Sequence, residues 1–225
     1  MKQNALRHKR LHATILRRAE KSALQWLVSK LPTWVTPDLM TGLGLGAACL
    51  IFSSYWLTNI NETFLWLANF GLILNWFGDS LDGTLARYRK IERPKFGYFI
   101  DHTVDALTQS LVALGIGLSP YVNIKFALIA LVGYLLVSIH TYITIYVNNT
   151  FKLSFGRIGP TEIRVLLIVV NTIVYFTGVP AFTIPVVMIS IYECIFLLGG
   201  FALFLTFIVS TIKQGIQIHT TIKKV

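Results

Sequence analysis

Six long apolar runs constrain this chain more than any other feature of its sequence. They occupy residues 39–58, 64–77, 98–118, 124–147, 163–178 and 182–212. A helix needs about 17–25 residues to cross a bilayer. The second run reaches this length if its helix extends past Phe77, and the fifth run reaches it if its helix begins at Pro160. Only 13% of the residues are charged, compared with about a quarter in soluble proteins. The sequence therefore predicts an all-α, polytopic membrane protein with six transmembrane helices.

Two details of these runs carry structural predictions. Gly42 and Gly46 lie one helical turn apart in the first run, and such a pair is expected to let a neighbouring helix approach closely. Pro185 lies in the last run, where it is expected either to kink the helix or to mark its true start.

The basic residues predict how the helices are oriented. All Lys and Arg residues except Lys125 lie before residue 39, between 77 and 98, between 147 and 165, or after 212. Because basic residues accumulate on the cytoplasmic side of membrane proteins, both termini are expected to be cytoplasmic. The net charge of +10 then reflects this topology and an attraction to anionic membrane lipids, and we expect no nucleic-acid partner.

The N-terminal segment predicts a separate amphipathic helix over residues 5–30. Its basic residues fall mostly on the side opposite to a set of apolar residues at helical spacing. This set comprises Leu11, Ile15, Leu16, Ala19, Ala23, Leu24 and Leu27. The pattern favours a helix lying on the cytoplasmic membrane surface, with a solvated basic arm as the alternative. Thr36 and Pro37 are expected to begin the first transmembrane helix as its N-cap and first residue.

These boundaries divide the chain into three predicted parts. Residues 1–36 form the interfacial segment, residues 37–214 form the transmembrane domain, and residues 215–225 form a cytoplasmic tail.

Four aspartates fall between residues 79 and 105, at the expected cytoplasmic ends of the second and third runs. Asp79 and Asp82 are three residues apart, so they share one face of the first helix. Asp101 and Asp105 are four apart and share a face of the next. Carboxylates at a membrane boundary are costly unless they are paired, solvated or bound to cations. The two helices are therefore expected to present two carboxylates each to a common space.

The chemistry of this cluster indicates a metal and a phosphate ligand. Oxygen ligands without an accompanying His/Cys cluster favour Mg²⁺ or Mn²⁺, and a pair of such ions can clamp the oxygens of a phosphoryl transfer. Gly83 and Ala86 share the helix face of Asp79 and have almost no side chain, so a flat ligand could lie against them. Arg87 offers a forked donor for a phosphate.

These residues resemble the signature of the CDP-alcohol phosphatidyltransferase family. The match spans 27 residues, and the nine-residue spacer between Arg87 and Gly97 is near the long end of the family's range. All eight signature positions are present, namely Asp79, Asp82, Gly83, Ala86, Arg87, Gly97, Asp101 and Asp105. The resemblance implies a six-helix, homodimeric membrane enzyme of phospholipid biosynthesis whose site opens to the cytoplasm. Such an enzyme cleaves a CDP-alcohol, releases CMP and moves the substituted phosphate to the hydroxyl of an acceptor alcohol.

The resemblance also implies residue roles. Two ions, Mg²⁺ or Mn²⁺, would be held by four metal ligands, Asp79, Asp82, Asp101 and Asp105. Asp105 would in addition act as the catalytic base. The CDP moiety would be bound by Asp82, Gly83, Ala86, Arg87 and Gly97.

Charged residues near the fifth run predict a possible acceptor pocket. Glu162 and Arg164 open this run, and Lys152 and Arg157 precede it. The alternative is that Glu162 only stabilises a helix N-terminus and that the basic residues only set the topology.

Three polar residues elsewhere are harder to interpret. His102 is expected to pack or to support Asp101 rather than to bind a metal, and His140 is expected to make a contact between helices. The sequence indicates no role for Glu193.

Two other classes of protein are compatible with parts of this pattern. A cation-coupled transporter could use the clustered aspartates, but it would not need Gly83, Ala86 and Arg87 at fixed offsets, and the chain shows no internal repeat. A non-catalytic scaffold would not need four costly carboxylates. The substrates stay open between CDP-diacylglycerol with a water-soluble acceptor, and CDP-choline or CDP-ethanolamine with diacylglycerol.

Overall fold

The computed structural model describes residues 17–148, 160–178, 181–184 and 187–222, and these residues form a predominantly helical protein. The helices are α1 (Arg17–Lys30), α2 (Pro37–Leu57), α3 (Phe64–Tyr88), α4 (Pro94–Gly117), α5 (Ile124–Asn148), α6 (Pro160–Thr177) and α7 (Ile191–Ile222). Two short strands, β1 (Ala181–Ile184) and β2 (Val187–Ser190), pair antiparallel with Ala181 opposite Ser190. The helical class is confirmed, and the hairpin is an addition that the sequence did not predict.

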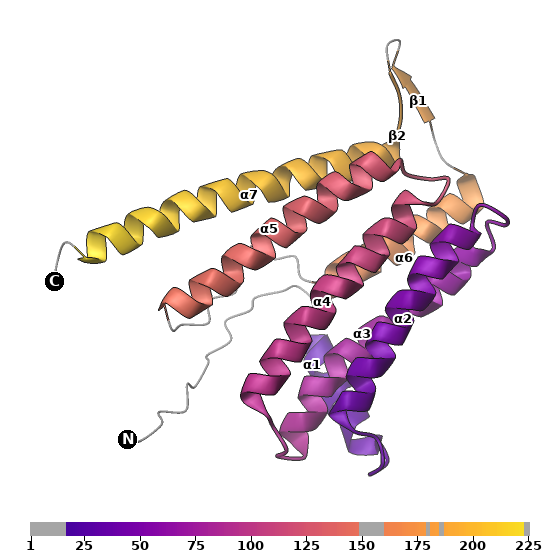
Figure 1. Cartoon of the computed structure of the whole chain (residues 1–225). Helices are drawn as coiled ribbons and strands as arrows, with labels where there is room; N and C mark the ends of the chain where they lie inside the picture. Colours follow the sequence, from indigo (N-terminus) through magenta and orange to yellow (C-terminus); the bar gives the residue numbers. More distant parts are fainter. Residues whose placement is uncertain (1–16, 149–159, 179–180, 185–186, 223–225) are drawn as a thin grey trace.

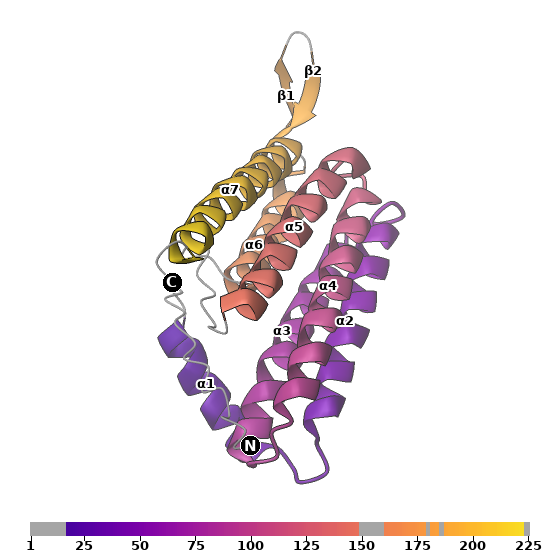
Figure 2. The ribbon, with the colours of Figure 1, turned by 60° about the vertical axis from the view of Figure 1, so that its left-hand side comes forward.

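The long helices pack in an order that differs from their order in the sequence (Figures 1 and 2). Helix α2 packs against both α3 and α4, α6 packs on α3, α5 packs on α4, and α7 lies along α5. The two aspartate-bearing helices, α3 and α4, therefore both pack on α2. The hairpin projects from the end of the molecule where α7 begins.

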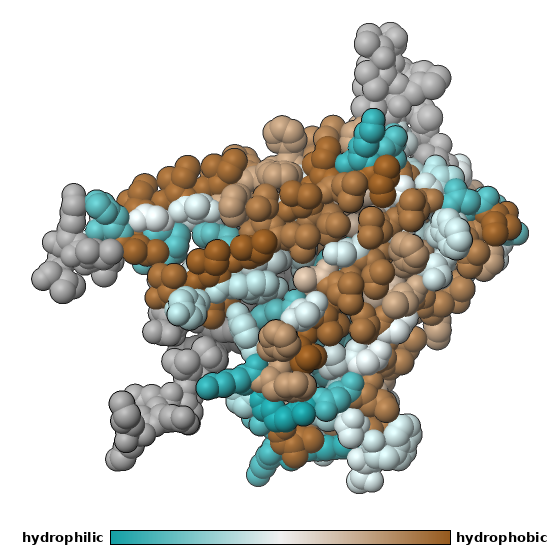
Figure 3. Space-filling model, in the orientation of Figure 1, coloured by the Kyte–Doolittle hydropathy of each residue, from teal (hydrophilic) through white to brown (hydrophobic). Residues whose placement is uncertain are grey.

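Four helices of the part that the structure describes, α2, α5, α6 and α7, are long and apolar enough to cross a membrane, so the chain is an integral membrane protein. Helices α3 and α4 have 25 and 24 residues but carry the aspartates, which lower their hydropathy. Figure 3 shows apolar side chains over the middle of the molecule and hydrophilic ones gathered at the lower end, where α3 meets α4. Four of the six predicted transmembrane helices are thus long and apolar enough to span, and the count of six stays a prediction.

The beginning of α2 matches the sequence pattern. Thr36 has an extended backbone, its hydroxyl accepts a hydrogen bond from the Leu39 amide at 3.2 Å, and Pro37 is the first helical residue. This side chain satisfies one of the amides that a helix leaves unpaired at its start.

The last helix begins later than its apolar run. The run starts at residue 182, but residues 181–190 contain the hairpin and α7 starts at Ile191. Thr183, Ile184, Val187 and Ile189 are β-branched, and such residues favour strands. Glu193 caps this start, because its carboxylate accepts hydrogen bonds from the amides of Ser190 and Asn123. Glu193, which had no predicted role, thus ties α7 to the turn before α5. At its other end α7 continues to Ile222, beyond the predicted tail boundary at 215.

Protein covers one side of helix α1. Leu24 and Val28 are buried, with Val28 only 1% exposed, and they pack with Leu81 and Leu85 of α3. The carboxylate of Glu20 accepts hydrogen bonds from the Trp76 indole at 2.9 Å and the Thr161 hydroxyl at 2.7 Å. The position of α1 on the membrane surface stays a prediction, and residues 5–16 of the predicted helix lie outside the described part.

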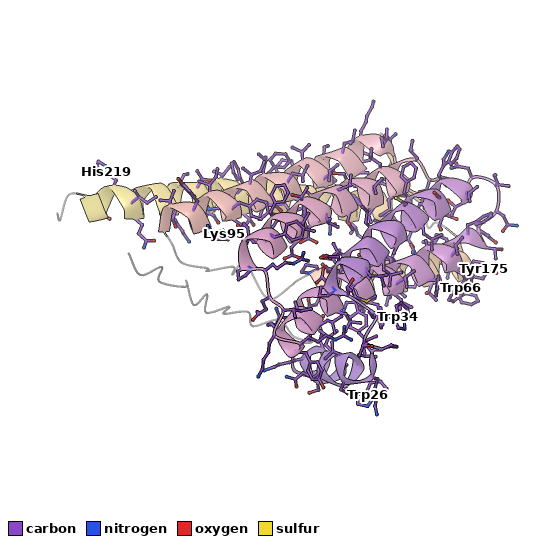
Figure 4. All side chains as sticks on the ribbon, turned by 60° about the horizontal axis from the view of Figure 1, so that its bottom comes forward. Trp26, Trp34, Trp66, Lys95, Tyr175 and His219 are labelled. Atoms are coloured by element: carbon purple, nitrogen blue, oxygen red, sulfur yellow. The ribbon has the colours of Figure 1, made fainter. Side chains whose placement is uncertain are left out.

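Two tryptophans, Trp26 on α1 and Trp34 in the segment between α1 and α2, are exposed. Trp26 is 62% exposed and Trp34 is 70% exposed, and Figure 4 shows them at the same end of the molecule. Indole rings are typical of the boundary between lipid and water. This end of the protein is therefore compatible with contact at a membrane surface.

The closest helix crossing in the site region uses a different glycine pair from the one predicted. A Cβ atom at Gly78 would lie 2.5 Å from the Gly44 amide nitrogen and 2.6 Å from the Met40 carbonyl oxygen. At Gly42 and Gly46 an added Cβ meets nothing within 4 Å. Among the residues that the structure describes, the prediction that Gly42 and Gly46 allow close approach is therefore wrong, because α3 approaches the other side of α2 and meets Gly44.

Polar contacts fix α6 alongside α3. The amide of Asn171 donates to the Asn69 side chain at 2.8 Å and accepts from the Tyr55 hydroxyl at 3.0 Å. Near the same end of both helices, the rings of Trp66 and Tyr175 pack edge to face with centroids 5.6 Å apart (Figure 4). Because buried polar groups need partners, these contacts set the register of α6 on α3.

Candidate active site

Three of the four signature aspartates meet between α3 and α4. Carboxylate oxygens of Asp79, Asp101 and Asp105 lie within 4.8 Å of one another, and all three residues are half-buried. Asp79 comes directly after Gly78, so the close crossing with α2 also fixes the height of Asp79 in the bundle. The two helices therefore bring their carboxylates to a common space.

Asp82 lines the same cavity but does not belong to this group of three. Its carboxylate accepts a hydrogen bond from the Thr41 hydroxyl of α2 at 2.8 Å. Thr41 thus holds Asp82 toward α2, while Asp79 lies near the carboxylates of α4. The predicted ligand set is divided into a close trio and a neighbouring fourth carboxylate.

A buried arginine reaches this cluster from α6. Arg164 is 7% exposed, and its guanidinium donates to the Asp79 carboxylate at 2.8 Å. Its Nε donates to the Asn75 side-chain oxygen at 2.9 Å, and the Asn75 amide donates to the Gly44 carbonyl at 2.8 Å. Both contacts of Arg164 are short and directed, so the side chain is held in one orientation.

The other signature residues lie at the C-terminal end of α3 and the start of α4. Arg87 is exposed and donates to the Thr84 hydroxyl at 3.1 Å, and its guanidinium lies 3.2 Å from where a Cβ of Gly83 would be. Ala86 is half-buried on α3, and an added Cβ at Gly97 would meet nothing within 4 Å. Gly97 therefore leaves backbone open to a ligand, whereas the Arg87 side chain lies over the backbone of Gly83.

The residues of the possible acceptor pocket are only partly described. Glu162 lies in the first turn of α6, and Arg164 points into the aspartate cavity from the same helix. Lys152 and Arg157 lie outside the described residues. Of this set, the structure therefore brings Arg164 to the cluster.

His102 packs between aromatic rings beside the cluster. Its ring stacks on Tyr142 of α5 at 4.7 Å and meets the edge of Tyr98 at 4.2 Å. Its Nδ1 lies 3.8 Å from an Asp101 oxygen. This arrangement agrees with the expectation of packing beside Asp101.

The sequence interpretation missed Asn75 and Thr41. Asn75 lies one turn before Asp79, and Thr41 lies one turn into the first predicted transmembrane helix. Both are therefore polar residues at helical spacing from other polar residues. That spacing could have indicated them. Their partners, Arg164 and Asp82, belong to other helices and could not be read from spacing.

The described carboxylates fit a hard divalent cation. The trio offers oxygen ligands only, and Asp82 adds a fourth carboxylate at the same cavity. Oxygen ligands of this kind suit Mg²⁺ and Mn²⁺, which bind carboxylates together with substrate phosphates. The site can therefore hold a cation next to a phosphate ligand.

Comparison with known families gives one match over most of the chain. The sequence profile described as CDP-alcohol phosphatidyltransferase matches residues 34–212. The match covers α2 to the first two-thirds of α7 and includes every signature residue.

Curated relatives are similar to the same region. Cholinephosphotransferase 1 of Danio rerio is 31% identical over 190 residues, which is 78% of this chain and 48% of the relative. Cholinephosphotransferase 1 of Homo sapiens is 28% identical over 188 residues, with 78% and 45% covered. Archaetidylinositol phosphate synthase of Pyrococcus horikoshii is 33% identical over 105 residues, with 46% and 52% covered. The chain spans about half the length of the curated relatives it matches.

Proposed function

Because the chain belongs to the CDP-alcohol phosphatidyltransferase family, we propose that it cleaves a CDP-alcohol, releases CMP and transfers the substituted phosphate to an acceptor hydroxyl. The observation that carries this proposal is the meeting of Asp79, Asp101 and Asp105 at the end of α3 and α4. A transporter would not require the complete set of eight signature residues, and none of the relatives named above has the name of a transporter.

Residues of this chain would bind the donor and accept the proton of the acceptor. Arg87 would bind the diphosphate by its forked donors, and Gly83, Ala86 and Gly97 would let the nucleotide approach the backbone. Asp105 would accept the proton of the acceptor hydroxyl as that oxygen forms its bond to phosphorus. The bond from phosphorus to the CMP oxygen would break at the same centre, so CMP leaves with the electron pair of that bond.

Asp79, Asp82, Asp101 and Asp105 would hold Mg²⁺ or Mn²⁺, with two ions expected from the four carboxylates. Bound metal supplies neutralisation of the charge on the phosphoryl oxygens. The chain's part is to fix the carboxylates, which it does for Asp82 through Thr41 and for Asp79 through Arg164.

The first experiment identifies the donor and acceptor substrates. Purified protein with Mn²⁺ is expected to release CMP from a CDP-alcohol only when a matching acceptor is present. Because the relatives that cover most of the chain are cholinephosphotransferases, CDP-choline with diacylglycerol is the first pair to test, followed by CDP-ethanolamine with diacylglycerol. CDP-diacylglycerol with serine, glycerol phosphate or inositol phosphate forms the second panel. Mass spectrometry of the lipid product identifies the pair, and an Asp101→Asn protein is the matched control. Absence of CMP release from every pair would contradict the proposed activity.

We propose that α3 and α4 also cross the membrane, which gives six spans with both termini and the site on the cytoplasmic side. The 25 residues of α3 correspond to about 37 Å at 1.5 Å per residue, enough for a bilayer core of about 30 Å. The loops that lack basic residues would then lie on the opposite side.

Cysteine labelling tests this topology. In a chain whose Cys49 and Cys194 are replaced by Ala, cysteines at Asn61 and Asn123 are expected to react with an impermeant reagent only from outside the cytoplasm. A cysteine at Lys90 is expected to react only from the cytoplasmic side. All three positions are exposed, so access to the reagent depends on the side of the membrane. The reverse labelling pattern would overturn the proposed orientation.

A homodimer is proposed on the family resemblance alone. The mass of the protein in detergent, measured by light scattering, distinguishes one copy from two.

A further inference from the structure

The cavity at the aspartates carries an unbalanced charge. Its lining includes four carboxylates, from Asp79, Asp82, Asp101 and Asp105, and one cationic side chain, from Arg164. Carboxylates this close repel one another strongly, particularly where protein excludes water. A protein that folds before it acquires metal needs a way to tolerate this repulsion.

Arg164 is built into the cavity rather than merely near it. It is 7% exposed, it pairs with Asp79 at 2.8 Å, and Asn75 fixes its Nε at 2.9 Å. Asn75 is itself fixed by the Gly44 carbonyl at the close crossing of α2 and α3. A buried guanidinium requires a compensating anion, and Asp79 supplies it.

We propose that Arg164 is the resident counter-cation of the aspartate site, which stabilises the metal-free protein and weakens metal binding. A divalent ion beside Asp79 is repelled by the guanidinium that shares this carboxylate. The same charge lowers the repulsion among the four aspartates while no ion is bound. Arg164 therefore lowers the metal affinity and raises the stability of the metal-free state, and both effects act through the charge that it places beside Asp79. This inference rests on the metal site of the proposed function.

The two effects of removing Arg164 have opposite signs, which separates this role from a purely structural one. Arg164→Gln leaves the carboxylates uncompensated, so the metal-free protein should unfold at a lower temperature. The same change removes the repulsion of the ion, so Mn²⁺ should bind about tenfold more tightly or better, as expected for one charge near a divalent ion. If Arg164 only held Asp79 in position, its loss would weaken Mn²⁺ binding.

The experiment measures Mn²⁺ binding without substrate. The full chain in detergent is stripped of metal and titrated with Mn²⁺, with the free ion followed by electron paramagnetic resonance, and thermal unfolding is recorded at each concentration. Arg164→Gln is expected to lower the metal-free unfolding midpoint and to approach the wild type at saturating Mn²⁺, because tighter binding stabilises the folded state more. Arg164→Lys keeps the charge and should bind Mn²⁺ within about threefold of the wild type.

Asn171→Ala is the matched control. Asn171 is a buried polar residue of the same helix, seven residues from Arg164, and it bonds Asn69 and Tyr55 rather than an aspartate. Its loss should lower the unfolding midpoint equally with and without Mn²⁺ and leave Mn²⁺ affinity unchanged. The control therefore shows what a loss of α6 packing alone does.

A second pair of variants covers the case in which Arg164→Gln does not fold without metal. Asp79→Asn leaves Arg164 buried without its carboxylate, so adding Arg164→Gln to Asp79→Asn should raise the unfolding midpoint. A double variant that is less stable than Asp79→Asn overturns the charge-balancing role. Mn²⁺ binding that is unchanged or weaker in Arg164→Gln overturns it as well, and leaves the proposed function intact. A wild type that binds no Mn²⁺ overturns both.

Discussion

Asp105→Asn is expected to slow CMP release in a single turnover by about 10²–10⁴, the usual contribution of a positioned base. Asparagine keeps an oxygen at the same place but cannot accept the proton of the acceptor hydroxyl. Binding of the CDP-alcohol should change much less, because Arg87 and the remaining carboxylates still bind the diphosphate. The measurement combines donor affinity by titration with single-turnover release of CMP.

Asp101→Asn is the informative comparison for this prediction. Both aspartates lie on α4 and belong to the same trio, but Asp101 is assigned only to metal binding. Its loss should therefore abolish both Mn²⁺ binding and turnover. Asp79→Asn is a poorer comparison, because it also leaves the buried Arg164 without its ion pair. If Asp105→Asn loses Mn²⁺ binding as completely as Asp101→Asn, Asp105 is chiefly a ligand, and Glu162 becomes the next candidate for the base.

Much of the fold could be predicted because capping residues indicate where a helix begins and the spacing of apolar residues indicates which face is buried. Thr36 and Pro37 predict the start of α2, and the structure confirms both the cap and the first residue. Hydropathy does not separate a short apolar strand from a buried helix, which explains why the apolar run from residue 182 did not predict the hairpin before α7. The pattern of α1 predicts an apolar face but does not tell whether lipid or protein covers it, and Leu24 and Val28 are covered by protein.

Sequence spacing predicts which site residues share a face of one helix, but it does not predict which residues of different helices are in contact. The spacing of Asp101 and Asp105 predicts that they share a face of α4, and their carboxylates do meet at one cavity. The contact of Arg164 with Asp79 depends on the register of α6 on α3, which Asn69 and Asn171 set. The prediction for Gly42 and Gly46 was wrong for the same reason, since sequence spacing does not say which side of α2 faces α3.

Gly78→Ala is expected to destabilise the protein by about 3 kcal/mol, at the upper end of the usual cost of overpacking. The added methyl group would lie 2.5 Å from the Gly44 amide nitrogen, 2.6 Å from the Met40 carbonyl oxygen and 2.8 Å from the Gly44 Cα. All three are backbone atoms, so no rotamer change can relieve the contact and α2 must move away from α3. For a chain of this size the unfolding midpoint should fall by roughly 6–12 °C, measured by thermal unfolding in detergent.

The same displacement should also reduce activity, because it separates Thr41 from Asp82 and Gly44 from Asn75. Gly46→Ala on the same helix is the matched control, since an added Cβ there meets nothing within 4 Å. Alanine is favoured over glycine inside a helix by about 1 kcal/mol, so Gly46→Ala should leave the unfolding midpoint unchanged or raise it. If Gly78→Ala is as stable as Gly46→Ala, α2 and α3 do not cross at Gly44. If instead Gly46→Ala is the variant that destabilises, the open face of α2 is covered by another copy of the chain in the detergent-solubilised protein.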